Sequence, residues 1–309
     1  MKIIVTGAAG LVGQNLIPRL KSNGSHEIVA IDKHPTNTKL LRRLHPDIVV
    51  VEGDLAEPGP WQQTFAATDC IVIGHAQIGG LDRDEFIRNN VVATKNVLDA
   101  VAQNRESRIV HISSSVVNSA AMDWYTETKK AQEQLVRDAS QAMVILRPTL
   151  MFGPFDRKHL GWLARFMKKA PIFPVPGNGR YLRQPLYVRD FCAIIEACIF
   201  GKVSKGIYDI SGWERIDFIE LIRLVRNTMG LRTPIVRIPY HLFWLLLRVY
   251  AFADGNPPFT TKQLEALVTP DEFPVIDWPG IFGISPTPLA TALKETFQGP
   301  SANDSVLDF

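Results

Sequence analysis

A tyrosine and a lysine four residues apart are the residues of this chain best suited to acid/base chemistry. Tyr125 and Lys129 lie in a helical pattern over residues 124–139, and side chains at i and i+4 share one helix face. An ammonium beside a phenol favours the phenolate and brings its pKa towards the working pH. The serines at 113–115 directly follow an apolar strand pattern, where a hydroxyl would orient a substrate oxygen. Such a trio is what reversible hydride transfer at a carbinol requires.

A glycine-rich turn at the start of the chain is suited to holding the partner of such a transfer. A β-branched run at residues 2–5 predicts a strand, and a helical pattern to Leu20 follows Gly7, Gly10 and Gly13. Gly7 permits a tight exit from the strand, Gly10 lets amides approach a pyrophosphate, and Gly13 lets the helix pack closely. The helix N-terminus then faces the anion. The turn predicts a dinucleotide site.

An acidic residue ends the next predicted strand and bears on the choice of dinucleotide. Residues 27–31 are apolar and stop at Asp32. A carboxylate there accepts hydrogen bonds from the adenosine ribose and repels a 2′-phosphate, which favours NAD over NADP. Lys33 and His34 follow immediately, and their cationic forms offer the alternative of holding a phosphate.

Strand and helix patterns alternate along the first half of the chain. Strands are predicted at 48–51, 69–73, 108–112 and 142–146, with a long helix at 85–104 before the one at 124–139. This rhythm predicts an α/β fold, a Rossmann-type doubly wound parallel sheet, with its ligand at the carboxyl ends of the strands.

The composition changes after residue 155, where proline and glycine become frequent, and we expect a smaller C-terminal substrate-binding lobe. The predicted division is a Rossmann domain at 1–155, to which 184–211 returns. The substrate lobe takes 156–183 and 212–299, and a tail without regular structure takes 300–309.

The bulk properties narrow the class of protein. The chain has 309 residues, 46% of them hydrophobic and 21% charged, and a net charge of +3 without a basic stripe, so nucleic acid is not an expected partner. Three cysteines without a CxxC pattern favour a reducing cytoplasm. We expect no metal site, with His75 and His111 packed near the sheet. The apolar stretch 242–252 is too short to span a membrane and is expected to form a helix buried on one face. No cleavable leader is apparent.

Four motifs together resemble the NAD-dependent epimerase/dehydratase family, the extended branch of the short-chain dehydrogenase/reductases. The turn at 6–13 resembles its TGxxGxxG, and 125–129 resembles its YxxxK. Arg147-Pro148 with Gly153-Pro154 is similar to its RPxxxxGP, and residues 188–190 to its VxD helix start.

The resemblance implies a role for individual residues. Tyr125 would be the acid/base, tuned by Lys129, and Ser114 the catalytic serine, with Ser115 as the alternative and as a substrate contact. Arg183 would contact a substrate diphosphate. The implied cofactor contacts are Gly7, Ala9, Gly10, Leu11, Val12, Asp32, Asp54, Leu55, Asn90 and Lys129.

Some positions depart from the family pattern and leave several functions open. Leu150 stands where many nucleotide-sugar enzymes carry asparagine, and Ser115-Val116 replaces the Asp-Glu pair of dehydratases. The first hypothesis is an NAD-dependent nucleotide-sugar epimerase with transient hydride transfer at C4. The alternatives are an NAD(P)-dependent 4-keto-sugar or other hydroxyl/keto reductase, a dehydrogenase of an apolar alcohol lined by 242–252, and a cofactor-binding non-catalytic subunit, towards which 257–264 points. The resemblance also implies a homodimer that packs the helices beginning at Glu85 and Trp124.

Overall fold

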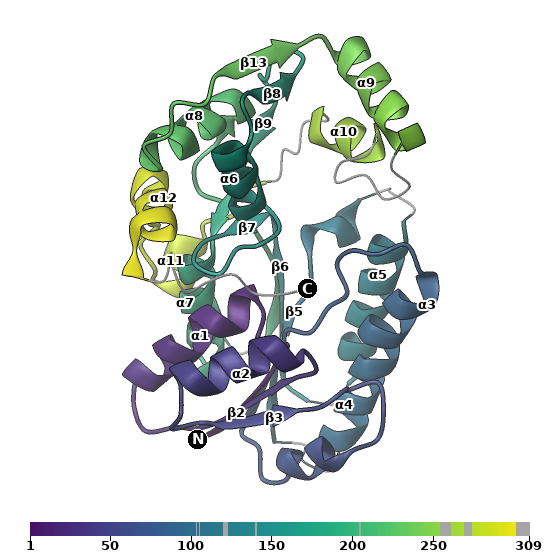
Figure 1. Ribbon diagram of the computed structural model, residues 1–309. Helices are drawn as coiled ribbons and strands as arrows, with labels where there is room; N and C mark the ends of the chain where they lie inside the picture. Colours follow the sequence, from purple (N-terminus) through teal and green to yellow (C-terminus); the bar gives the residue numbers. More distant parts are fainter. Residues whose placement is uncertain are drawn as a thin grey trace.

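A seven-stranded, wholly parallel sheet forms the centre of the protein, seen edge-on in Figure 1. The computed structural model describes residues 1–102, 104, 106–119, 123–139, 141–203, 205–253, 261–268 and 274–300. The strand order is β11-β6-β5-β4-β1-β2-β3. The strands are β1 (Lys2–Thr6), β2 (Glu27–Asp32), β3 (Val49–Glu52), β4 (Cys70–Ile73), β5 (Arg108–Ile112), β6 (Met143–Pro148) and β11 (Gly206–Ile210). The winding reverses between β1 and β4, so the predicted doubly wound sheet is confirmed.

Alternating side chains give the sheet two apolar faces, each covered by helices. Ile3 and Val5 of β1 join one buried cluster, while Ile4 joins the other. The first face carries α1 (Leu11–Ser22), α2 (Pro35–Leu44) and α7 (Val188–Ile199), and the second carries η1 (Pro60–Phe65), α4 (Ala93–Val101) and α5 (Trp124–Arg137) (Figure 1). Strands buried on both sides are apolar throughout, as the sequence of β4 shows.

The long helix predicted at 85–104 is three consecutive helical segments. It begins with α3 (Arg83–Phe86), whose first turn is capped by the carboxylate of Asp82. A wider π-helical turn, η2 (Ile87–Val92), follows and leads into α4. The segments run alongside α5, so the predicted helix pair is present on this side of the sheet.

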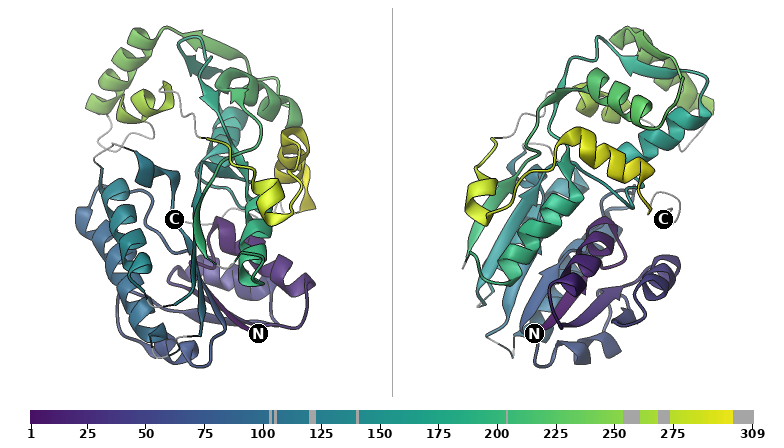
Figure 2. Two further views of the ribbon diagram at one scale, coloured as in Figure 1. Left: turned by 180° about the vertical axis from the view of Figure 1, so that it is seen from behind. Right: turned by 90° about the vertical axis from the view of Figure 1, so that its left-hand side faces the viewer.

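A second layer of short ladders and helices lies beyond the carboxyl ends of the strands (Figure 2). Its helices α6 (Leu160–Lys169), α8 (Phe218–Thr228) and α12 (Leu289–Gln298) enclose two smaller apolar clusters. Its two-stranded ladders pair β7 (Met151–Phe152) with β10 (Leu186–Tyr187), β8 (Phe173–Pro176) with β13 (Ile235–Ile238), and β9 (Leu182–Arg183) with β12 (Ile216–Asp217). The helix α11 (Trp278–Phe282), assigned from the sequence to the substrate lobe, packs both terminal side chains into the core beside α7.

The prediction of a helix at residues 242–252 is confirmed, but the prediction that one face of this helix is buried is wrong. The helix exists as α9 (Tyr240–Ala253), but none of the side chains described on it, those of 240–250, is buried. The side chains of α9 are not buried because the helix packs mainly on one short helix, α10 (Thr261–Val268), rather than on the core. Within the described ranges, no helix is long and apolar enough to cross a membrane. Residues 257–260 and 301–309, on which two predictions rest, lie outside the described residues.

Candidate active site

A cleft of about 1450 Å³ opens where the sheet ends and the second layer begins. It exceeds the roughly 300–1,000 Å³ of a pocket for one drug-sized ligand, so there is room for two molecules. The glycine turn, the ends of β4 and β5, the start of α5 and the loop after β7 all line it. Parallel strands direct their carboxyl ends to this edge, which is why residues distant in sequence meet here.

The glycine turn fits the task predicted for it at two positions. Gly7 has φ +64, and a Cβ there would lie 2.7 Å from the amide nitrogen of His75. At Gly13 a Cβ would lie 2.2 Å from the carbonyl oxygen of Ala8, so only glycine lets α1 lie this close to the main chain of the turn. Gly10, Leu11 and Val12 line the cleft, and α1 begins there without a side-chain cap. The first amides of the helix therefore face the cleft as an anion site.

Asp32 is held in place beside this turn by the main chain. Its carboxylate accepts hydrogen bonds from the amides of Ala9 and His34, each at 3.0 Å. Burial raises the pKa of Asp32, and the two amide bonds oppose that rise. The Ala9 amide is thus occupied by Asp32, and Ala9 itself is buried behind the cleft surface. Ala9 therefore orients the carboxylate of Asp32 and does not itself line the cleft.

The cation after Asp32 is already engaged by other side chains. The ammonium of Lys33 donates to the amide oxygen of Asn89 at 2.7 Å and lies 3.8 Å from the carboxylate of Asp54. Asp54 and Leu55 line the cleft, and Asp54 also accepts from the guanidinium of Arg88 at 2.7 Å. Burial raises the pKa of Asp54, but its bonds from the Ala56 amide and Arg88 outweigh it and hold that pKa below its ordinary value.

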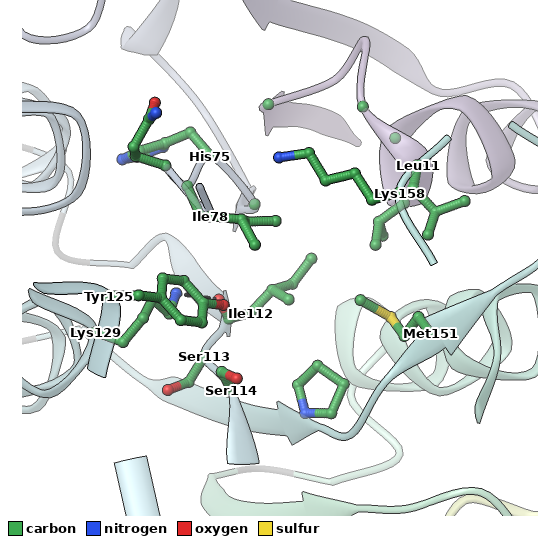
Figure 3. Close-up of a pocket in the computed structure, with 18 of the residues that line it drawn as sticks. Leu11, His75, Ile78, Ile112, Ser113, Ser114, Tyr125, Lys129, Met151 and Lys158 are labelled. Atoms are coloured by element: carbon green, nitrogen blue, oxygen red, sulfur yellow. Dashed lines mark hydrogen bonds between the residues drawn. The ribbon is translucent and has the colours of Figure 1, made fainter. Parts of the chain in front are cut away.

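The predicted acid/base trio does meet at one wall of the cleft. Tyr125 and Lys129 share a face of α5, and Ser114 follows the end of β5 (Figure 3). The side chains of Ser114, Tyr125 and Lys129 all line the cleft. Burial raises the pKa of Tyr125, the Ser114 hydroxyl lowers it, and the nearby Asp123 raises it further. A cation close to the phenol is therefore needed to favour the phenolate near neutral pH.

Lys129 is a buried cation anchored to the strand end. Only 1% of it is exposed, and its ammonium donates to the carbonyl oxygen of Ile112 at 2.9 Å and to the amide oxygen of Gln132. Burial lowers the pKa of Lys129 to about 7, and the carboxylate of Glu133 opposes the shift. The group is thus poised to change its charge near neutral pH.

A buried hydrogen-bond chain, missed by the sequence interpretation, extends from this lysine to the glycine turn. The amide of Gln132 donates to the hydroxyl of Thr94 at 2.8 Å, and that hydroxyl lies 3.0 Å from Nε2 of His75. Nδ1 of His75 lies 2.9 Å from the hydroxyl of Thr6 on β1. Burial lowers the pKa of His75 to about 3, so its ring is neutral. These hydrogen bonds fix the part of the cleft wall that lies between Lys129 and the glycine turn.

A second buried network supports the serine run. Ser113 donates to the carboxylate of Glu133 at 2.7 Å, and Arg147 of β6 bonds the same carboxylate at 2.6 Å. Burial alone raises the pKa of Glu133, but its bonds from Arg147, Ser113 and Arg137 prevail and lower it to about 2. The Arg147 of the predicted RPxxxxGP segment therefore braces the strand end rather than facing the cleft. Ser115 is buried and lines the cleft.

Two more of the predicted contacts, besides Ala9, are engaged by other parts of the protein. Asn90 is fully buried and absent from the cleft lining, because its amide bonds the main chain of Gln77 and the hydroxyl of Thr128. Asn89 faces the cleft instead. Arg183 lines the cleft, but its guanidinium donates to the carbonyl oxygen of Leu267, in the last turn of α10. The sequence indicated neither partner.

Another cationic segment faces the cleft from the side opposite Tyr125. Arg157, Lys158 and His159 follow β7 and line the cleft, and Lys158 reaches into it in Figure 3. Burial, together with the neighbouring Arg157, lowers the pKa of Lys158 to about 8. Apolar side chains of Ile78, Leu150 and Met151 line the same space. No sequence motif pointed to this cationic segment.

The histidines and cysteines show no catalytic or metal-binding arrangement. No group of three or more His, Cys, Asp or Glu side chains in the described part of the chain is placed to hold a metal ion. Cys70, Cys192 and Cys198 are buried, and burial raises the pKa of each thiol. Cys192 lies beneath the glycine turn, where its thiol donates to the carbonyl oxygen of Val12 at 3.6 Å.

Comparison with known proteins places this geometry in context. A model of the NAD dependent epimerase/dehydratase family matches residues 3–210. A 2-alkyl-3-oxoalkanoate reductase from Stenotrophomonas maltophilia is 28% identical, over 87% of this chain and 90% of its own. A ceramide reductase from Caulobacter vibrioides is 25% identical, over 77% and 73%. The fold is similar to that of a UDP-glucuronic acid 4-epimerase from Bacillus cereus in complex with NAD, with a TM-score of 0.75, 20% identity and 97% and 98% of the two chains covered.

Proposed function

The chain belongs to the NAD-dependent epimerase/dehydratase family of the short-chain dehydrogenase/reductase superfamily, and we propose that it is a nucleotide-sugar epimerase that uses NAD. The observation that carries the proposal is the meeting of Ser114, Tyr125 and Lys129 at one wall of the cleft, opposite a cationic wall. A proton acceptor and an anion site in one cleft suit a sugar with a diphosphate.

The proposed reaction divides its work among three side chains. NAD, when bound, would supply a reversible acceptor for the hydride of C4. Tyr125 accepts the proton of the C4 hydroxyl and later gives it back. Ser114 holds the developing carbonyl oxygen, and Lys129 favours the phenolate electrostatically. The wide cleft leaves room for a 4-keto sugar to rotate, so that either face of the ketone can be reduced. No net oxidation or reduction results.

The residues present fit NAD. The open amides at the start of α1 suit a pyrophosphate, and the close approach at Gly13 brings them to the cleft. Asp32 is oriented by two amides to accept from ribose hydroxyls. Lys33 is bonded to Asn89 and lies near Asp54, so it is drawn away from a 2′-phosphate. These contacts support NAD over NADP.

The diphosphate of the substrate is assigned to the segment 157–159. Arg157 and Lys158 line the cleft and carry charge at neutral pH, because even the lowered pKa of Lys158 is about 8. Burial lowers the pKa of His159, so its ring is neutral at that pH. Arg183 takes a structural part in this proposal, since it donates to the carbonyl at the end of α10.

A second candidate function is the reduction of a ketone on an apolar substrate. It is favoured by the apolar side chains of Ile78, Leu150 and Met151 in the cleft, and by the reductases among the relatives. The helix α9, which the sequence suggested as a lining for such a substrate, is absent from the described lining of the cleft. The intact Ser114 and Tyr125 pair weighs against a non-catalytic subunit.

One experiment separates the candidates. The purified protein is incubated with NAD and UDP-sugars, and with NADH and a 3-oxoalkanoate, while the absorbance of reduced nicotinamide is followed and the sugars are separated by chromatography. An epimerase converts one sugar into its C4 epimer without accumulating NADH. A reductase consumes NADH with the ketone and leaves the sugars unchanged, which would contradict the first proposal.

The division into domains and the oligomeric state are also proposals. We propose that residues 1–155 and 184–211 form the cofactor domain and that 156–183 and 212–299 contribute the substrate lobe. We also propose a homodimer that pairs α4 and α5 with their copies. Sedimentation velocity at micromolar concentration tests the dimer, and a stable monomer would contradict it.

A further inference from the structure

The helix α9 carries a continuous apolar stripe that faces away from the protein. Leu242, Leu245, Leu246 and Val249 are between 48% and 61% exposed. Their spacing places them on one arc of roughly a third of the helix circumference, because an α-helix turns by about 100° per residue. Isolated exposed leucines are ordinary, but four on consecutive turns of one helix form a patch.

The other side of α9 is occupied by its support. Phe243, Trp244 and Leu247 are half-buried, and α9 contacts α10. Leu264 of α10 is fully buried, and Leu267 packs against the apolar cluster of the second layer. The stripe is therefore held outward by a helix pair that is anchored from behind. Figure 1 shows the pair at the end of the molecule furthest from β3.

The charge around the stripe is one-sided. No aspartate or glutamate occurs between Glu220 and Asp254, a stretch that contains five arginines. Arg237 of β13 and Arg248 of α9 are exposed, and the Arg248 guanidinium lies 5.2 Å from the centre of the Trp244 ring. On the helical arc, Arg248 and His241 border the apolar stripe on the same side.

We propose that this face, formed by the stripe of α9 together with Arg248 at its border, binds the surface of an anionic lipid bilayer. An apolar stripe bordered by cations lies in the interface of such a bilayer, with the apolar side chains at the acyl boundary and the cations among the phosphates. At 14 residues, α9 is about 21 Å long, which is too short to span a bilayer but suits lying along one.

The charges favour a bilayer over a second copy of the chain. A twofold contact through the stripe brings the arginines of one copy towards those of the other, and like charges oppose such a contact. The surface also adjoins the cleft, because the α10 carbonyl that receives Arg183 belongs to the supporting helix. A docked protein would hold the end of its cleft at Arg183 nearest to the bilayer.

The test is sedimentation of the full chain with vesicles. Vesicles of phosphatidylcholine alone are compared with equal parts of phosphatidylcholine and phosphatidylglycerol, at low and high salt. Leu245→Gln is expected to lower the partition coefficient about tenfold, by removing one buried apolar side chain. Its matched control is Ile281→Gln, an exposed aliphatic residue on α11. Arg248→Gln is expected to weaken binding to the anionic vesicles roughly fivefold and Arg43→Gln to leave it unchanged.

Each outcome decides the matter. Binding that needs the anionic lipid, weakens with salt and falls in Leu245→Gln supports the proposal. Failure of the wild-type protein to bind anionic vesicles overturns it, as does binding that Leu245→Gln and Ile281→Gln reduce equally. Self-association that dissociates in Leu245→Gln, without vesicle binding, assigns the face to a second copy instead. The wild-type comparison of lipids and salt stands even where a variant folds poorly.

Discussion

The ammonium of Lys129 bonds the main-chain carbonyl oxygen of Ile112, at a distance of 2.9 Å. Ile112 is the last residue of β5, directly before the serine run that supplies Ser114. One contact thus fixes the cation of α5 to the strand that carries the serine. The position of Tyr125 relative to Ser114 depends on this anchor as well as on the helix.

Tyr125→Phe is expected to lower hydride transfer by at least about a hundredfold, because it removes the only titrating oxygen proposed as acid/base. Binding of NAD should stay within about twofold, since the aromatic ring remains. Single-turnover absorbance of the nicotinamide and a cofactor titration measure the two effects. Tyr208→Phe, on β11 and absent from the cleft lining, serves as the control. Full turnover in Tyr125→Phe would disprove the assignment.

Lys129→Met should change how stability depends on pH. Burial lowers the pKa of Lys129 from 10.5 to about 7, so between these values the native state binds fewer protons than the unfolded state. The free energy of unfolding of the wild type, relative to Lys129→Met, should therefore rise from pH 7 towards pH 10.5. Urea unfolding at several pH values measures it. Lys168→Met, at an exposed position on α6, should show no such trend.

Glu133→Gln should destabilise the protein by about 1.5–3 kcal/mol near neutral pH, because it removes the buried charged acceptor of Ser113, Arg137 and Arg147. The pKa of Glu133 is lowered from 4.5 to about 2, so its contribution is complete above 4.5 and is lost as the pH falls towards 2. The difference between variant and wild type should shrink over that range. Denaturant unfolding tests it, with exposed Glu127→Gln on the same helix as control. A difference independent of pH would contradict the argument.

Asp32→Ala should reduce the preference for NAD over NADP by about ten- to a hundredfold. It removes a charged acceptor worth roughly 1.5–3 kcal/mol for the ribose hydroxyls and the repulsion of a 2′-phosphate. Calorimetric titration with both dinucleotides measures the ratio. The control is Asp47→Asn, where an exposed carboxylate is paired with Lys21. An unchanged ratio would show that another group selects the cofactor.

Lys158→Met should weaken the binding of UDP about tenfold, through loss of one charge-assisted contact. Because the pKa of Lys158 is about 8, the affinity of the wild type should decline as the pH rises past that value. In contrast, Arg183→Met should lower the melting temperature, since Arg183 donates to the Leu267 carbonyl. A variant of Arg183 that loses UDP binding and keeps its stability would return the diphosphate to the residue first predicted from the sequence.

Local spacing predicted the parts of the site that lie on one element or one turn. The Tyr125 and Lys129 pair follows from helix periodicity, and the placement of Asp32 follows from the strand that ends at it. The doubly wound parallel sheet followed in the same way from alternating strand and helix patterns, since its central strands are apolar on both faces.

Partners from distant elements could not be inferred in this way. Arg183 meets a carbonyl 84 positions away, and the chain from Gln132 to His75 crosses three elements. The hydrophobic pattern of α9 predicted a helix, but a pattern does not tell whether protein covers it. Asn90 fits the family motif, yet its amide is taken by Gln77 and Thr128.

The thiol of Cys192, which lies against the carbonyl oxygen of Val12, can report local opening of the glycine turn. A thiol whose pKa is raised by burial reacts with an alkylating reagent only during the moments when α7 and α1 part. The rate of labelling then measures how often the two helices separate, without any change to the sequence. A dinucleotide bound to the same turn would lower this rate by mass action, so labelling would detect binding even where no reaction follows.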